Sequence, residues 1–470
     1  MVVDHAQAPA TQPGLSAALT EIAALIGARL SLSEADRDQH GQSETWHSAP
    51  PPDAVAWPET TAEVSAIMAI CNRHRVPVIG WGTGTSLEGH ALAVRGGLVL
   101  DMMRMNRVLS VSPSDMLATV QPGVTREDLN TELRATGLFF PIDPGANASL
   151  GGMAATRASG TMAVRYGTMR DAVLALEVVL ADGRIIRTGT RAAKSSAGYD
   201  LTALMVGSEG TLGIITELTL RLHGQPEDVA AALCGFATLE EAVECVAQTM
   251  QAGIPMARIE FMDAVAMRAL NDFSGTDYAE SPLLLVEFNG SPDAVRANAE
   301  TFGEIAGECG GKGFRWAETP EARKQLWQAR HNAYWAMLKQ RPGSTGVVTD
   351  VCVPMSELPG AVSAAAGDME TAGLMGNIVG HVGDGNFHCL MLVMPGDADE
   401  LARAKTAAEA MARRAIAVGG TVSGEHGIGL GKRNLMAGQH GEGWALMGAI
   451  KAALDPNDIL NPGKMVPDRA

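Results

Sequence analysis

The order of apolar and polar positions predicts a first half built from short strands and helices. Short apolar runs are typical of strands, and amphipathic stretches, one opened by Thr60 and one closed by Gly137, are typical of helices. Two runs around Ala181-Asp182-Gly183 predict a β-hairpin. The expected strands are 54–57, 76–79, 97–101, 117–120, 173–180, 184–188 and 211–222, and the expected helices are 17–29, 60–74 and 126–136.

After Pro226 the pattern changes to strand, long helix and strand, repeated to about residue 415. Thr319 followed by Pro320 predicts a helix start, because threonine caps helices and proline fits the first helical position. An antiparallel sheet covered by helices accounts for this half, so we expect an α+β fold. The expected strands are 230–236, 257–261, 282–288, 346–353 and 377–393, and the expected helices are 238–252, 292–309 and 319–339.

The length of the chain predicts more than one domain. Its 470 residues exceed the ~100–200 of a typical domain. The last fifty residues are rich in glycine, like the first half, and we expect them to fold back against it. The expected segments are an N-terminal extension over 1–50, a first domain over 51–226, a second domain over 227–418 and a returning C-terminal segment over 419–470.

Charge and cysteine content narrow the partners and the compartment. The 36 basic and 53 acidic side chains give a net charge of −17, which argues against a nucleic acid or an anionic membrane as partner. No apolar run approaches the ~20 residues of a membrane span, and the first fifteen residues resemble neither a signal nor a transit peptide. The six cysteines form no CxxC pair and are expected to be reduced. We therefore expect a cytoplasmic protein, free or at the periphery of the inner membrane.

Glycine is in excess, with 53 of 470 residues, or about 11% against a usual ~7%. The glycines cluster in unlike segments, which is typical of backbone that must approach a cofactor closely. The loop Gly80–His90 follows an expected strand and can hold a phosphate on its N–H groups, or it can be a plain turn. It is not a Rossmann fingerprint, because Leu87 occupies the position of the third glycine.

Two histidines lie around a tight turn in GHVGDGNFH, residues 380–388. If Asp384-Gly385 forms a two-residue type I′ turn, His381 lies directly opposite His388. Opposed Cβ atoms on one face are ~4.5–5.5 Å apart, so both imidazoles can bind one metal ion. The alternative is a polar cross-strand pair near the surface.

A third metal ligand is available in SGEHGIG, residues 423–429. Glu425 and His426 lie there between glycines, so one can bind a metal while the other handles a proton. On the helix expected from Thr319, Trp327 and Arg330 share a face with Tyr334. Arg330 can pair with a carboxylate, stack on Trp327, or hold a substrate carboxylate.

Eight segments together resemble a known family. The chain, from about residue 40, resembles the flavin-dependent D-2-hydroxyacid dehydrogenases of the vanillyl-alcohol oxidase type, and among them the cytochrome-linked D-lactate dehydrogenases. The segments are GTGTSLEGH (82–90), DMMRMNRVL (101–109), QPGVT (121–125), PIDPGANASLGGMAATRASGTMAVRYGTMRD (141–171), VGSEGTLGIIT (206–216), GHVGDGNFHCLMLV (380–393), GEHGIGLGKR (424–433) and LDPNDILNPGK (454–464).

The resemblance implies an FAD-binding domain completed by the C-terminal segment, and an antiparallel-sheet cap domain for the substrate. It implies that FAD is bound non-covalently, although His90 ends the glycine loop at a position where some relatives attach the flavin. The residues implied to hold the FAD pyrophosphate are Gly82, Thr83, Gly84, Thr85 and Ser86. Those implied for the remainder of FAD are Pro144, Gly145, Gly151, Gly152, Ala155, Ser159, Gly160, Gly210, Ile215 and Asn461.

The same resemblance implies a chemistry: hydride transfer from C2 of a D-2-hydroxy acid to flavin N5. His381, His388 and Glu425 would bind a divalent metal, which can be zinc, manganese or iron. His426 would be the base and Arg330 would hold the substrate carboxylate. The expected electron acceptor is a cytochrome, a quinone or another flavoprotein.

Several alternatives stay open. The substrate could be D-2-hydroxyglutarate or glycolate, although apolar residues after His388 (Cys389, Leu390 and Met391) favour the methyl group of lactate. A different class is a metal-dependent hydrolase whose glycine loops bind a phosphate ester. A third is a non-catalytic flavin-binding or metal-binding partner protein.

Overall fold

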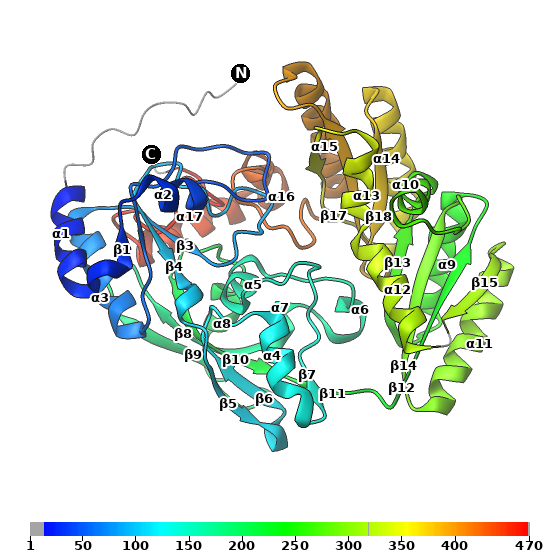
Figure 1. The fold of residues 1–470 in the computed structure, drawn as a ribbon, viewed down its shortest axis with the longest axis horizontal. Coiled ribbons are helices and arrows are strands. Elements are labelled where there is room, and N and C mark those ends of the chain that lie inside the picture. Colours follow the sequence, from blue (N-terminus) through cyan, green and yellow to red (C-terminus); the bar gives the residue numbers. More distant parts are fainter. Residues whose placement is uncertain (1–13, 318, 469–470) are drawn as a thin grey trace. The chain divides into compact units, whose positions relative to one another are not determined.

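The computed structural model describes residues 14–317 and 319–468, which form two compact units. The first unit contains 14–159, 167–225 and 425–468, and the second contains 160–166 and 226–424. Figure 1 shows the elements of each unit. The first 13 residues, where the N-terminal extension was expected to begin, lie outside the described part.

A four-stranded sheet opens the first unit. Its order is β1-β2-β4-β3, and β2, β4 and β3 run parallel. Helices α1 (Leu15–Ile26) and α3 (Thr61–His74), blue in Figure 1, pack together. They bury Ile22 and Ile67 in one core. The strands are β1 (Leu30–Ser31), β2 (Ala54–Ala56), β3 (Val78–Trp81) and β4 (Leu98–Asp101).

A five-stranded antiparallel sheet follows, in the order β5-β6-β10-β8-β9. The expected hairpin is confirmed, since Val179 of β8 pairs with Ile185 of β9. The strands are β5 (Val108–Ser112), β6 (Leu117–Val120), β8 (Val173–Val179), β9 (Ile185–Gly189) and β10 (Ile214–Arg221). The other elements of this unit are α2 (Glu34–His40), α4 (Arg126–Glu132), α5 (Leu150–Thr156), α7 (Met169–Ala172), α8 (Leu201–Met205), α16 (Met436–His440), α17 (Glu442–Leu454), and the paired β7 (Leu138–Phe139) and β11 (His223–Gly224).

The C-terminal segment adds to the first sheet. Leu460 bridges Val78 of β3, Val78 N donates to Ile459 O over 2.7 Å, and Asn461 N donates to Val78 O over 2.8 Å. The segment thereby places Asn461 beside Val78, the first residue of β3, and β3 leads into the glycine loop.

The second unit contains an antiparallel sheet in the order β15-β12-β14-β13-β18-β19-β16, with β17 also paired to β19. Side chains of β14 alternate between the two faces of this sheet. Leu285 packs with residues of α10 and α12, and Phe288 packs against Phe302 of α11. The strands are β12 (Asp228–Gly235), β13 (Met256–Met262), β14 (Leu283–Gly290), β15 (Lys312–Ala317), β16 (Thr345–Val348), β17 (Val351–Cys352), β18 (Gly376–Gly380) and β19 (Asn386–Val393). The helices are α6 (Ala163–Tyr166), α9 (Leu239–Gln251), α10 (Ala264–Ser274), α11 (Pro292–Glu308), α12 (Pro320–His331), α13 (Ala333–Gln340), α14 (Leu358–Ala372) and α15 (Ala398–Ala417).

The expected register of the histidine hairpin is wrong by two residues. Val379, not His381, lies opposite His388. The turn is longer than two residues, because His381 O accepts from Asp384 N and Val382 O from Gly385 N in a 3-10 turn. A shift of two keeps His381 and His388 on the same face, because side chains alternate with a period of two.

The single helix expected over 319–339 is two helices joined at Asn332. Asn332 N still donates to Gln328 O, and Asn332 O accepts from Ala336 N. Thr319 caps the start as expected, accepting from Ala322 N.

Among the residues that the structure describes, no helix has both the length and the apolar character needed to cross a membrane. All six cysteines are free thiols, as expected.

Candidate functional site

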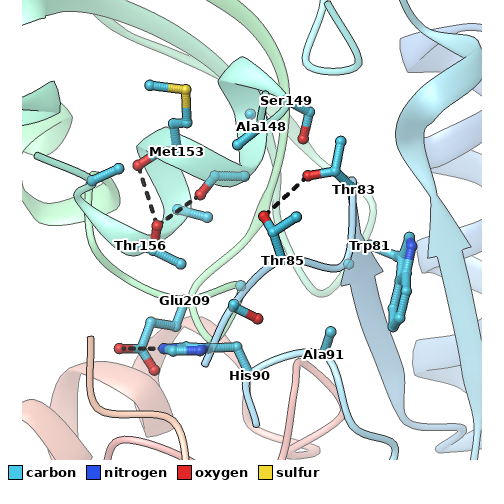
Figure 2. A pocket seen from close by; sticks show the side chains of 18 of the residues that line it. Trp81, Thr83, Thr85, His90, Ala91, Ala148, Ser149, Met153, Thr156 and Glu209 are labelled. Carbon is cyan, nitrogen blue, oxygen red and sulfur yellow. Dashed lines mark hydrogen bonds and ion pairs between the residues drawn. The ribbon is translucent and has the colours of Figure 1, made fainter. Parts of the chain in front are cut away.

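The glycine loops of the first unit line one cavity (Figure 2). It contains about 1340 Å³ of empty space, which includes a part open to solvent. Of the residues expected to hold FAD, the following line it: Gly82, Thr83, Gly84, Thr85, Ser86, Pro144, Gly151, Gly152, Ala155, Ser159, Gly210, Ile215 and Asn461. Gly145 and Gly160 are not among the lining residues.

Several of these glycines have a steric reason to be glycine. At Gly84, where φ is +73°, a Cβ atom would lie 2.6 Å from the Trp81 ring, and at Gly82 it would collide with the Ser149 hydroxyl. At Gly210, by contrast, the nearest atom to a Cβ is Asn461 Nδ2 at 3.9 Å, so a side chain there would take up cavity space. The backbone can therefore approach a bound group closely, as FAD requires.

The donors that the cavity offers to a phosphate are hydroxyls and backbone N–H groups. Its described lining residues include no lysine or arginine. Thr83 and Thr85 lie with their hydroxyls 3.3 Å apart, and Ser149 lies near them (Figure 2). Backbone N–H groups and hydroxyls are the donors on which a pyrophosphate can bind.

A buried carboxylate, Glu209, lies at the other side of the cavity. Its oxygens accept from Ile428 N over 2.7 Å and Gly429 N over 2.8 Å, and Oε1 lies 3.2 Å from His90 Nε2 (Figure 2). Burial by itself raises the pKa of Glu209, but the charge of His90 and these hydrogen bonds outweigh it and lower the pKa. Glu209 therefore stays ionised and ties the C-terminal segment to the glycine loop.

The end of the C-terminal segment closes the same network. Asn461 Nδ2 donates to His90 O over 3.0 Å and to Glu209 O over 2.7 Å. Lys464, which is 1% exposed, donates to Asn461 Oδ1 and Leu92 O. Burial lowers the pKa of Lys464 to about 7, although Glu209 opposes the shift.

Glu425 and His426 also line this cavity. The glycine after them is required, since a Cβ at Gly427 would lie 2.6 Å from His90 Nε2 and 2.7 Å from Glu209 Oε1. The backbone at Gly427 therefore lies directly against these two buried side chains.

His381 and His388 meet in the second unit. Their ring centroids are 5.4 Å apart with the rings nearly perpendicular. His381 Nδ1 lies 2.7 Å from Glu260 Oε1, and His388 Nδ1 lies 3.1 Å from Thr349 O. Both partners accept hydrogen bonds, so each neutral imidazole carries its proton on Nδ1 and its lone pair on Nε2.

Arg330 pairs with a carboxylate, which was one of the three sequence alternatives. Its Nε donates to Glu260 Oε2 over 2.9 Å, and its side chain is 12% exposed. Trp327 stacks instead under Arg258, whose guanidinium carbon lies 4.5 Å from the ring centroid. Among the described residues, Arg330 makes no hydrogen bond through Nη1 or Nη2, which leaves both for another anion.

Sequence reasoning missed several buried polar residues around these groups. Glu209, Glu260 and Lys464 were not singled out, nor was Asp350, which accepts from Asn386 Nδ2 and Ser423 Oγ. Glu260 carried a signal, because it is an acidic residue on an otherwise largely apolar strand. Which partner each carboxylate meets depends on which distant segments the fold brings together, and no local sequence pattern contains that information.

Comparison with known proteins assigns the chain to a family. A model described as "FAD linked oxidases, C-terminal domain" matches residues 225–465, and one described as "FAD binding domain" matches residues 52–189. The chain belongs to the FAD-linked oxidases. FAD is therefore its cofactor, in agreement with the glycine-lined cavity, and a metal-dependent hydrolase has no support.

Three of its relatives are named as D-lactate dehydrogenases or as a glycolate oxidase subunit. A probable mitochondrial D-lactate dehydrogenase of Danio rerio is 50% identical over 93% of this chain and 89% of its own length. A mitochondrial D-lactate dehydrogenase [cytochrome] of Arabidopsis thaliana is 42% identical over 96% and 80%. The glycolate oxidase subunit GlcD of Bacillus subtilis is 38% identical over 88% and 89%.

The solved structure of p-cresol methylhydroxylase shares the fold. It has a TM-score of 0.79 and 21% identity, over 97% of this chain and 97% of its own. The expected FAD-binding fold of the vanillyl-alcohol oxidase type, with an antiparallel-sheet domain, is confirmed.

Proposed function

We propose that this FAD-linked oxidase oxidises D-lactate to pyruvate, with His426 as the base. The observation that carries the proposal is that His426 lines the same cavity as the glycine loops. A base and the cofactor site thus belong to one cavity. The names of the relatives at 50% and 42% identity support D-lactate as substrate.

We infer that the cofactor lies along the glycine loops. Gly82, Thr83, Gly84, Thr85 and Ser86 would hold the pyrophosphate, with the remaining expected residues, including Asn461, along the rest of FAD. When bound, FAD supplies the oxidant that accepts the hydride from C2 of the substrate. Non-covalent binding stays our prediction, and His90 is engaged with Glu209.

His381, His388 and Glu425 are proposed to bind a divalent metal. The two histidines fit a metal because each holds its lone pair on Nε2 through an acceptor at Nδ1. Glu425 directly follows Gly424, whose Cβ position lies against the Asn386 amide, two residues before His388. Two nitrogen ligands and one carboxylate suit zinc, manganese or iron, and the metal supplies a Lewis acid for the substrate hydroxyl.

The protein's own groups would then handle a carboxylate and a proton. Arg330 binds the substrate carboxylate through Nη1 and Nη2, while its Nε stays on Glu260. His426 accepts the hydroxyl proton, and a neutral imidazole suits this because its ordinary pKa of ~6.5 is near working pH. Holding the substrate by its carboxylate and its hydroxyl would orient the C2 hydrogen toward the oxidant.

One of the three apolar residues after His388 has a structural role. Leu390 packs in a core cluster with Ala336 and Met337, so its apolar character does not by itself indicate the substrate. The preference for lactate over glycolate or D-2-hydroxyglutarate therefore depends on the relatives, of which one is named a glycolate oxidase subunit.

Anaerobic stopped-flow reduction of the bound flavin tests the proposal. D-lactate should bleach the flavin absorption faster than L-lactate, glycolate or D-2-hydroxyglutarate. Fast bleaching by L-lactate alone would overturn the stereochemistry, and faster bleaching by glycolate or the diacid would reassign the substrate. Removal of metal by a chelator should slow bleaching without releasing FAD, and added Zn²⁺ or Mn²⁺ should restore it.

A cytochrome is the proposed electron acceptor, as the name of the Arabidopsis relative indicates for that protein. Steady-state reduction of cytochrome c compared with a soluble quinone tests this choice. The cytoplasm stays our predicted compartment, whereas the Danio and Arabidopsis relatives are named mitochondrial.

A further inference from the structure

Glu260 joins two of the proposed site residues through one carboxylate. It lies on β13, is fully buried, and uses each oxygen for a different partner. Oε1 lies 2.7 Å from His381 Nδ1, and Oε2 lies 2.9 Å from Arg330 Nε. All three residues belong to the second unit.

A carboxylate this deeply buried needs both partners. Removing an ionised carboxylate from water is costly unless a cation and further hydrogen bonds compensate. Arg330 supplies the positive charge and His381 supplies the second donor. The strand order places His381 there, because Phe261, next to Glu260, pairs with Gly380, next to His381. Arg330 comes from helix α12.

The hydrogen bonds to Glu260 determine the tautomer of His381 and the orientation of the Arg330 guanidinium. With Nδ1 donating to Glu260, neutral His381 has its lone pair on Nε2, the nitrogen proposed to bind the metal. With Nε donating to Glu260, the Arg330 guanidinium is held in one plane, and Nη1 and Nη2 are available to a carboxylate.

We propose that Glu260 is a positioning residue that couples metal binding at His381 to substrate binding at Arg330. The inference rests on the proposed function of these two residues. It implies that one carboxylate sets both the metal affinity and the KM for the substrate.

The substitution Glu260→Gln tests this with little change in shape. A glutamine amide has one accepting oxygen and one donating nitrogen, but it would face two donors. If the amide nitrogen faces His381, the imidazole must hold its proton on Nε2 and lose its lone pair for the metal. If the amide nitrogen faces Arg330, the guanidinium must move.

Two measurements follow the two partners separately. Zn²⁺ affinity is measured on metal-free protein by competition with a chromogenic chelator, and KM and kcat are measured with D-lactate on the holoenzyme. We expect Glu260→Gln to weaken Zn²⁺ binding, to raise KM, or both, by roughly 10–100-fold, the usual effect of losing such a partner. Glu260→Ala, which removes both acceptors, should change both quantities.

Glu287→Gln is the matched control. Glu287 lies on the neighbouring strand β14, is 7% exposed, and pairs with Arg258 at 3.6 Å, so its loss also breaks a buried ion pair of the same sheet. Its ion pair is with Arg258, and Zn²⁺ affinity and KM should stay within about twofold of the parent protein. Melting temperatures of all variants separate misfolding from lost positioning.

The outcomes distinguish this inference from the function on which it rests. If Glu260→Gln and Glu260→Ala both leave Zn²⁺ affinity and KM unchanged while His381→Ala abolishes Zn²⁺ binding, the coupling is wrong and the metal site stands. Unchanged Zn²⁺ affinity in His381→Ala overturns the metal site itself. Equal losses in Glu287→Gln would show that any broken ion pair of this sheet has the same effect, and would also overturn the coupling.

Discussion

Buried polar side chains, more than exposed ones, define the chemistry of this protein at the residue scale. The Lys464 amine has two acceptors, Leu92 O and Asn461 Oδ1, which match the two N–H groups of a neutral amine. Burial lowers its pKa to about 7, so the amine loses its proton more easily in the folded chain than in the unfolded one.

Lys464 should therefore make stability rise with pH. Between pH 7 and about 10.5 the unfolded chain holds a proton that the folded chain has released, so the free energy of unfolding increases in this window. The increase from this group is roughly 2–3 kcal/mol between pH 6 and 9. Lys464→Met should lower the melting temperature more at pH 9 than at pH 6, whereas the exposed Lys194→Met should show no such difference. An equal decrease at both pH values would show that Lys464 does not titrate in this window.

His426→Ala should lose most of kcat and keep FAD. General base catalysis contributes about 10²–10⁴-fold, and the glycine loops that hold FAD are unchanged. Turnover with D-lactate and the flavin absorption of the purified variant check both parts. His440→Ala, an exposed histidine of the same C-terminal segment, is the control. Turnover that survives His426→Ala would remove this residue from the mechanism.

Turns and strand ends, at the scale of elements, bring the site residues together. The turn between β18 and β19 positions His381 and His388, and it depends on Gly385, whose φ is +77°. A Cβ there would collide with Val353 O. Val353 is itself held close to the turn, because its backbone N donates to Gly385 O over 3.0 Å.

Gly385→Ala should destabilise the second unit and weaken metal binding. Left-handed backbone costs an L-residue roughly 1 kcal/mol, and the collision with Val353 O adds to it. Gly396→Ala is the control, since φ there is +87° but nothing lies within 4 Å of its Cβ position. A melting temperature several degrees lower in Gly385→Ala than in Gly396→Ala, with weaker Zn²⁺ binding, is the expected result. If both variants lower the melting temperature equally, the loss of stability comes from the left-handed backbone alone and not from the collision with Val353 O.

Sequence patterns predicted these elements well and their partners poorly. Alternation and capping signals placed α3, β6 and the β8–β9 hairpin, because those signals are local. The meeting of His381 and His388 was predicted despite the wrong register, since a shift of two keeps the face. Glu260 was missed because its role depends on β13 lying beside β18, a pairing between distant segments.

At the scale of the whole molecule, the cofactor cavity is assembled from segments far apart in the chain. The glycine loop near residue 84, the turn at Glu209 and the C-terminal Asn461 all line it. Asn461 holds the first two together through hydrogen bonds to His90 O and Glu209 O.

Asn461→Ala should weaken FAD binding by about tenfold or more. Two hydrogen bonds are lost, each of about 1 kcal/mol, and two carbonyls near the cavity lose their donor. Equilibrium titration of the FAD-free protein with FAD measures the change. Asn457→Ala is the control, because Asn457 bonds Asn72 and does not line the cavity. Equal FAD affinity in both variants would contradict a clamping role for Asn461.

The insertion of the second unit within the first has a consequence for biosynthesis. When residue 225 leaves the ribosome, the strand β3 still lacks its partner Leu460, and Glu209 lacks Gly429. Residues 226–470 take roughly 12–50 s to synthesise at ~5–20 residues per second. During that interval the second unit can fold first, while the earlier residues wait with an open edge. The complete cavity, and with it the capture of FAD, therefore requires that synthesis has passed Asn461.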